Sequence, residues 1–170
     1  VEGKRFGEAS VMAHIRVADL NARIVRLFNA YGPRMAPQDG RVAPTFITQA
    51  LAGEPLTIRG DGTQTRSFCF VDDIVAGVMR AADSDAAQGV VINLGNSAEI
   101  SILDFAAAVS EAAGVELRIT HLPGLDDDPV RRRPDVGRAS ALLGWQPEVA
   151  LRDGLRRTVA AYRAEMVAKI

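Results

Sequence analysis

The sequence of 170 residues is poor in the residues that mark several classes of protein. One cysteine and two histidines exclude an internal disulfide and make a metal site unexpected. Basic residues number 20 and acidic residues 21, so no net charge favours nucleic acid or a membrane surface. No apolar run approaches the roughly 20 residues of a membrane span, and no signal peptide is recognisable. We therefore expect a globular, cytoplasmic protein that holds no metal.

A glycine-rich turn is also missing. Dinucleotide-binding folds place such a turn between their first strand and helix, so that backbone N–H groups can approach the pyrophosphate. No G-x-G-x-x-G or G-x-x-G-x-x-G pattern occurs in the printed residues. Any dinucleotide pocket is therefore expected to be completed by residues outside this sequence.

Helical and extended patterns alternate along the chain, which predicts the α/β class. Helices are predicted over residues 1–20, 42–52, 73–83, 101–113, 137–143 and 151–168, and strands over 23–28, 56–58, 67–71, 90–94 and 116–122. Residues 29–41 hold two prolines and two glycines, which predicts a loop.

Local signals refine this outline. The GDGT turn at residues 60–63 predicts that the strands on either side of it form a hairpin. Asp72 is predicted to cap the following helix, and Ser101 with Asp104 resembles a capping box. Trp145 is predicted to anchor a core before the last helix, and Cys69 to be a buried strand thiol.

Five motifs carry functional information. They are EGKR at residues 2–5, RLFNAYGPRM at 26–35, DGRV at 39–42, GDGTQTR at 60–66 and DDP at 127–129. In this order they resemble the extended short-chain dehydrogenase/reductases, the NAD-dependent epimerase/dehydratase family, and within it the UDP-glucuronate decarboxylases. The resemblance implies a Rossmann-type α/β fold, of which this chain would be the C-terminal part: the final strands of the parallel sheet and a small α/β substrate-binding domain.

The resemblance also divides the chain. It implies that residues 1–35 end the NAD-binding Rossmann domain and that residues 36–170 are mainly substrate-binding, with 60–95 returning partly to the Rossmann sheet. It implies a homodimer formed through the helix at 1–20. The chain alone is then expected to be inactive, prone to associate and a poor binder of NAD.

Lys4 would close the family's Tyr-x-x-x-Lys motif, and its tyrosine would stand immediately before Val1. Residues four apart lie on one face of a helix, and an ammonium beside a phenol stabilises the phenolate that acts as base. The family also uses this lysine to bind the cofactor's ribose. On spacing alone, Lys4 could equally be a solvated surface lysine.

Asn29 follows an apolar strand at its carboxyl end, where α/β sheets place ligands. The resemblance makes Asn29 a substrate contact and places Ala30 and Tyr31 beside the nicotinamide. The alternative is a turn-forming asparagine whose amide satisfies the local backbone.

Three arginines, Arg41, Arg66 and Arg132, are predicted to hold a nucleotide sugar, because guanidinium supplies forked donors to a diphosphate. The resemblance places Val42 to Phe46 along the uridine diphosphate. Arg132 lies in a charged segment that could simply be solvated.

The resemblance implies the following reaction: bound NAD oxidises C4 of UDP-glucuronate, the 4-keto intermediate loses CO2, and the returning hydride gives UDP-xylose. Two alternatives stay open. One is another nucleotide-sugar 4,6-dehydratase or 4-epimerase; the other is a non-catalytic nucleotide-sugar binding module. Arg59, where many relatives carry tyrosine, leaves the base specificity open as well.

Overall fold

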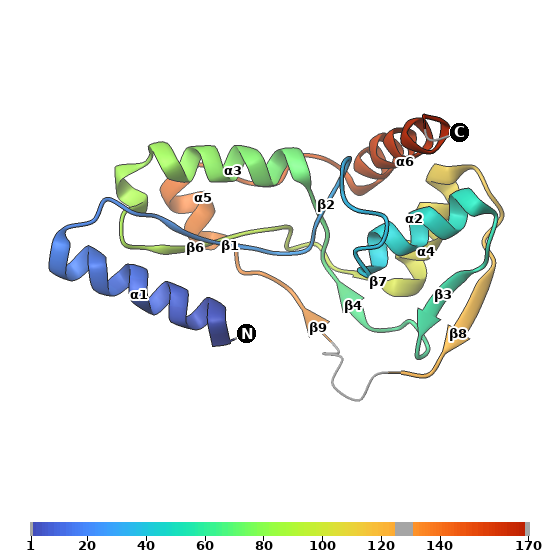
Figure 1. Cartoon of the computed structure of the whole chain (residues 1–170), viewed down its shortest axis with the longest axis horizontal. Helices are drawn as coiled ribbons and strands as arrows, with labels where there is room; N and C mark the ends of the chain where they lie inside the picture. Colours follow the sequence, from blue (N-terminus) through green and yellow to red (C-terminus); the bar gives the residue numbers. More distant parts are fainter. Residues whose placement is uncertain (1, 125–130, 169–170) are drawn as a thin grey trace.

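The computed structural model describes residues 2–124 and 131–168, and of residues 131 and 132 it describes the backbone alone. The molecule is elongated, with two groups of helices and strands joined by short strands in its middle (Figure 1). None of the described helices is long and apolar enough to cross a membrane.

The first group is built on two parallel strands, β1 (Ile24–Leu27) and β6 (Val91–Leu94). Helices α3 (Val71–Asp83) and α5 (Gly137–Leu143) pack against them, and a short 3-10 turn, η1 (Asp85–Ala87), follows α3. Their core includes Cys69, Ile74, Ile92, Leu94 and Trp145. Helix α1 (Glu2–Ala18) lies along the outside and buries none of its residues (Figure 1).

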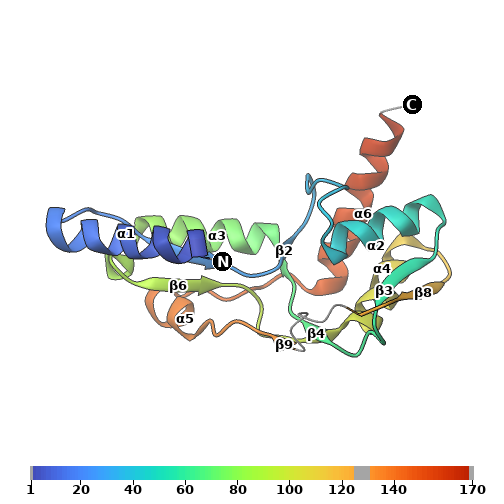
Figure 2. The ribbon, with the colours of Figure 1, turned by 60° about the horizontal axis from the view of Figure 1, so that its bottom comes forward.

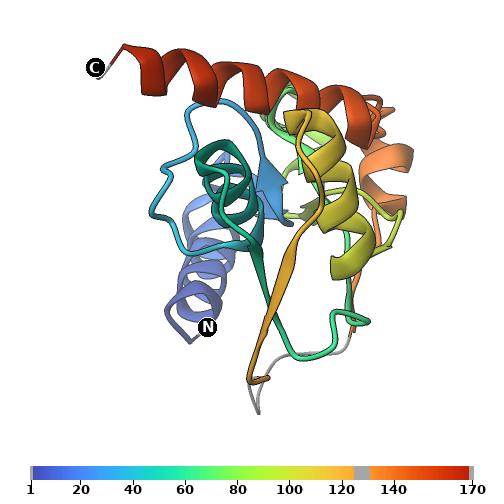
Figure 3. The same ribbon diagram turned by 90° about the vertical axis from the view of Figure 1, so that its right-hand side faces the viewer.

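The second group holds three helices, α2 (Val42–Ala52), α4 (Ile102–Ala113) and α6 (Leu151–Val167). Figure 3 shows α6 lying across α2 and α4, and the parallel strands β3 (Leu56–Arg59) and β8 (Ile119–Leu122) run below these helices in this view. Aromatic side chains dominate this core: the rings of Phe68 and Phe105 stack with centroids 3.9 Å apart.

Short strands connect the two groups (Figure 2). Strand β2 (Ala30–Tyr31) pairs in parallel with β5 (Cys69–Phe70). Strand β4 (Thr65–Arg66) lies between β7 (Ile100–Ser101), which is antiparallel to it, and β9 (Arg131–Arg132), which is parallel.

The predicted α/β class is confirmed, since helices and strands alternate and most strand pairs are parallel. The predicted hairpin is wrong: β3 pairs with β8, and β4 pairs with β7 and β9. At residues 60–63 the chain leaves the sheet of β3 and enters the sheet of β4, so the strands on either side of the turn are not partners. The predicted loop at 29–41 contains β2, whose two residues are too few to be recognised by alternation.

The cap predicted at Asp72 is also wrong. Helix α3 begins at Val71, and its N-cap, Phe70, makes no side-chain cap. Asp72 instead forms a 2.5 Å ion pair with Arg157 of α6. The cap predicted at Ser101 is confirmed, because Ser101 Oγ accepts from the backbone N–H of Asp104 at 3.0 Å. The carboxylate of Asp104 accepts from the hydroxyl of Ser101 at 2.6 Å.

The two predicted core residues are confirmed. Trp145 is 1% exposed, and its Nε1–H donates to the carbonyl of Asp73 at 2.9 Å. Cys69 is equally buried, and this burial raises the pKa of its thiol to about 12.

Candidate functional site

One cavity of about 530 Å³ lies where the middle strands meet the second group. This volume is in the range of small-molecule sites. Six of the predicted site residues line it: Asn29, Ala30, Arg41, Val42, Phe46 and Arg66. They come from three separate parts of the chain, residues 29–30, 41–46 and 66, and the fold brings them together.

Asn29 stands at a switch between two strand pairs. The preceding N–H, of Phe28, donates to Leu94 of β6 at 2.9 Å, whereas the carbonyl of Asn29 accepts from Cys69 of β5 at 3.2 Å. At this junction Asn29 adopts a φ of 36°, in the left-handed region that asparagine tolerates better than most residues. Ligands of α/β folds bind at such points, beyond the carboxyl end of a strand.

The amide of Asn29 is incompletely satisfied. Its Nδ2 is buried and has no hydrogen-bond acceptor among the described residues. A buried donor without a partner costs about 1–3 kcal/mol, so native proteins rarely keep one without a reason. Because Asn29 lines the cavity, a ligand with an acceptor oxygen would satisfy this donor.

The cavity is cationic. Its lining, as far as the described residues define it, contains Arg41, Arg59 and Arg66 and no aspartate or glutamate. Arg66 is ordered by its own strand, since one of its Nη1–H groups donates to the carbonyl of Thr65 at 2.7 Å. Three guanidinium groups around one cavity suit a ligand that carries two negative charges or more.

The N-terminus of α2 adds to this positive potential. Gly40 to Ala43 line the cavity, and Arg41 is the N-cap, with an extended φ of −77° and ψ of 157°. The N–H groups of the first helical turn have no intrahelical acceptor, and the helix dipole makes this end attractive to anions. Because Arg41 is the N-cap, its guanidinium and the N–H groups of this helix end offer an anion two kinds of hydrogen-bond donor at one wall of the cavity.

An apolar wall completes the cavity. Phe46, Ile58 and Phe68 line it and are buried, being 1%, 1% and 6% exposed. Such a surface suits a planar or apolar part of a ligand, while the arginines hold its charged part.

Of the predicted site residues whose side chains the structure describes, two do not line this cavity, Tyr31 and Lys4. Tyr31 is 2% exposed, and its O–H donates to the carbonyl of Leu151 at 3.2 Å, so it serves the core between β2 and α6. Lys4 is exposed on α1. Arg132 lies in β9 with its Cα in register with that of Arg66, and its side chain lies outside the description. Their functional roles stay predictions.

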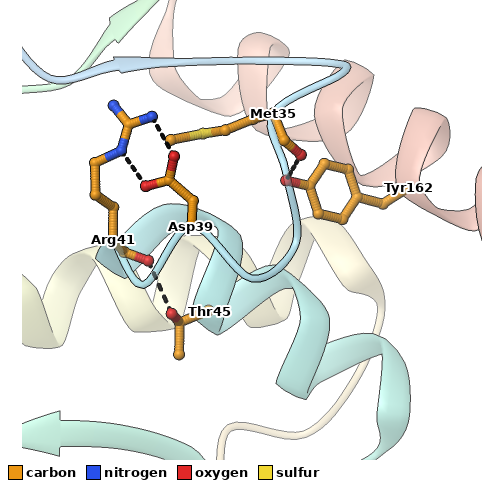
Figure 4. A network of polar contacts seen from close by, with 5 residues as sticks. All are labelled: Met35, Asp39, Arg41, Thr45 and Tyr162. Atoms are coloured by element: carbon orange, nitrogen blue, oxygen red, sulfur yellow. Dashed lines mark hydrogen bonds and ion pairs between the residues drawn. The ribbon is translucent and has the colours of Figure 1, made fainter.

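One residue beside the site escaped the sequence reasoning. The carboxylate of Asp39 accepts two hydrogen bonds from the guanidinium of Arg41, which pairs an acid with a predicted ligand-binding arginine (Figure 4). The available signal was the acid of the DGRV motif itself, two positions before the arginine.

Parallel strands and a strand switch at Asn29, beside a cavity lined by arginines, define the chain as part of a Rossmann-type α/β protein. The chain belongs to the NAD dependent epimerase/dehydratase family, whose family model matches residues 2–95.

Relatives within the family are close in sequence. The chain is 47% identical to UDP-glucuronic acid decarboxylase 4 of Arabidopsis thaliana and 43% identical to UDP-glucuronic acid decarboxylase 1 of Xenopus tropicalis. These alignments cover 95% and 97% of this chain but 36% and 39% of the relatives. The chain thus spans well under half the length of the curated relatives it matches.

Solved structures of epimerases support the same family membership. An epimerase from Methanothermobacter thermautotrophicus superposes with a TM-score of 0.91 at 31% identity, over 98% of this chain and 51% of the other. UDP-glucuronic acid 4-epimerase from Bacillus cereus, in complex with UDP-glucuronic acid and NAD, superposes with a TM-score of 0.85 at 32% identity, over 94% and 50%.

Proposed function

We propose that this chain forms the nucleotide-sugar-binding part of a NAD-dependent UDP-glucuronate decarboxylase. The observation that carries the proposal is the cavity in which three arginines and the unsatisfied amide of Asn29 converge. The identity of 47% to a plant UDP-glucuronic acid decarboxylase supports the choice of substrate.

In this proposal the diphosphate lies between the α2 N-terminus, Arg41 and Arg66, which supply N–H donors and positive charge. Arg132 is proposed to join the same group, which is supported by the register of its Cα with that of Arg66 in the neighbouring strand. The amide of Asn29 donates to an oxygen of the ligand, and Val42 and Phe46 pack along the nucleotide.

NAD is proposed as the cofactor, because the family is NAD dependent and the related Bacillus cereus epimerase was solved with NAD. When bound, NAD supplies reversible hydride transfer. Of the residues predicted to contact it, only Ala30 lines the cavity, and the printed sequence contains no glycine-rich turn. The described residues therefore do not by themselves form a dinucleotide cradle.

A 4-epimerase is the second candidate, favoured by the likeness to an enzyme solved with UDP-glucuronic acid. Both reactions use the same substrate, so the cavity alone does not separate them. The curated decarboxylases are closer in sequence, at 41–47% against 32% identity. We therefore place decarboxylation first.

A chimera tests the proposal. In the Arabidopsis decarboxylase, the 162 matched residues are replaced by the corresponding residues of this chain, and the product of UDP-glucuronate is analysed. Release of CO2 with formation of UDP-xylose supports the proposal. Formation of UDP-galacturonate would favour the 4-epimerase, and a folded chimera that binds no UDP would refute a nucleotide-sugar site.

Three finer proposals accompany this function. The product is UDP-xylose, the location is the cytoplasm, and the complete protein is a homodimer paired through α1. The last is supported by α1 itself, which buries none of its residues and exposes Phe6 (75%) and Val17 (88%). Sedimentation of the complete protein, with Phe6→Asp as the disrupting change, tests the dimer.

A further inference from the structure

The ion pair between Asp39 and Arg41 lies at the edge of the cavity, and its acid has no role in the proposed function. Both carboxylate oxygens of Asp39 accept from Arg41, one from Nε–H and one from Nη2–H at 2.7 Å (Figure 4). Arg41 lines the cavity and Asp39 does not. The hydrogen bonds from Arg41 hold the pKa of Asp39 below its usual value, so the carboxylate is ionised at neutral pH.

This pairing leaves Arg41 able to bind a ligand. A guanidinium has five N–H donors in a rigid plane. Asp39 takes two of them on the Nε side, so one N–H of Nη1 and one of Nη2 remain on the terminal edge, while the second N–H of Nη1 faces the Cδ side. That edge is itself a fork of the kind that binds phosphate oxygens. The acid therefore fixes the plane of the guanidinium without blocking it.

The backbone around this pair is fixed as well. On one side, the O–H of Tyr162 in α6 donates to the carbonyl of Met35 at 2.6 Å. On the other, the carbonyl of Arg41 accepts from Thr45 Oγ1 at 2.8 Å (Figure 4). Between them, the N–H of Asp39 donates to the carbonyl of Ala36 at 3.1 Å. The side chain of Arg41 is 55% exposed, and its guanidinium is held by the carboxylate of Asp39.

We propose that Asp39 is a positioning residue of the nucleotide-sugar site: it orders Arg41 before the ligand arrives, so that the terminal edge of the guanidinium receives the diphosphate. This inference rests on the proposed function. An ordered arginine loses less side-chain freedom when the ligand binds, which strengthens binding. The negative charge of Asp39 acts in the opposite direction, because it repels an anionic ligand. The two effects predict opposite changes in the affinity for the ligand when Asp39 is removed: loss of the ordering weakens binding, and loss of the negative charge strengthens it.

Calorimetric titration with UDP and NMR titration with uridine separate them. With Asp39→Ala, we expect UDP to bind three- to tenfold more weakly, about 0.7–1.4 kcal/mol, and uridine to bind unchanged. The matched control is Asp153→Ala, which removes an acid that pairs with Arg156 on α6 at 3.5 Å, away from the cavity lining. It should change neither affinity. Asp39→Asn keeps one acceptor oxygen and should give an intermediate affinity for UDP.

Each other outcome overturns the inference in a recognisable way. If Asp39→Ala binds UDP as tightly as the unchanged chain, or more tightly, Asp39 acts only as a charge. If Asp39→Ala weakens the binding of UDP and of uridine equally, Asp39 supports the loop and does not position Arg41. If the unchanged chain binds no UDP, the proposed function fails and this inference fails with it.

Discussion

Replacing Gly154 by alanine is expected to destabilise the chain, although alanine favours helices. Gly154 lies in α6, and a Cβ there would overlap Oη of Tyr31 and lie 2.8 Å from Cδ2 of Phe70. Both rings are buried, at 2% and 1% exposure, so neither can move into solvent. Overpacking of this kind costs about 1–3 kcal/mol. Displacing Tyr31 also breaks its hydrogen bond to Leu151, worth about 0.5–1.5 kcal/mol.

The helix preference for alanine offsets about 0.5–1 kcal/mol of this loss. The net expectation is a destabilisation of about 1–3 kcal/mol, or a fall in Tm of about 3–10 °C for a chain of this size. Gly7 in α1 is the matched control, because a Cβ there meets nothing within 4 Å. Gly7→Ala should raise Tm slightly. Scanning calorimetry that finds the same upward shift for both variants would refute the packing argument.

Three further predictions concern the cap of α4, the buried thiol and the pH dependence of stability. Ser101→Ala removes the cap of α4 and should lower stability by about 1 kcal/mol in chemical denaturation; no change would mean that the cap contributes nothing. The Cys69 thiol should resist iodoacetamide at pH 8 until the chain unfolds, as mass spectrometry would show, because burial keeps it protonated. Burial raises the pKa of Tyr31 as it does that of Cys69. Because the unfolded chain then releases these protons at a lower pH than the folded chain, stability should fall as pH rises above about 9. A flat stability curve from pH 8 to 11 would contradict this.

The sequence predicted what depends on neighbouring residues. Helix α2 begins and ends where its pattern indicated, because Gly53 adopts the left-handed conformation that stops it. The cap of α4 was also predictable, because Ser101 and its partner Asp104 lie within four residues of sequence. Five of the six cavity residues were found because they belong to short motifs, and Phe46 was found through the family resemblance. Their meeting in space comes from the fold.

What failed depends on distant partners. Asp72 has the local features of a cap, yet its partner is Arg157, on another helix. Strand β3 has a turn beside it, yet its partner is β8. The unsatisfied amide of Asn29 was beyond prediction, since it reflects the absence of an acceptor among all the groups that surround it in the described structure.

The most direct test of the central claim, that this cavity binds a nucleotide sugar through Asn29 and the arginines, is a calorimetric titration of the chain with UDP. We predict saturable 1:1 binding, weakened at least tenfold by Asn29→Asp, because that change replaces the unpartnered donor by an anion while tolerating the φ of 36°. Equal affinity in the two proteins would contradict the account, and so would the absence of binding to the unchanged chain.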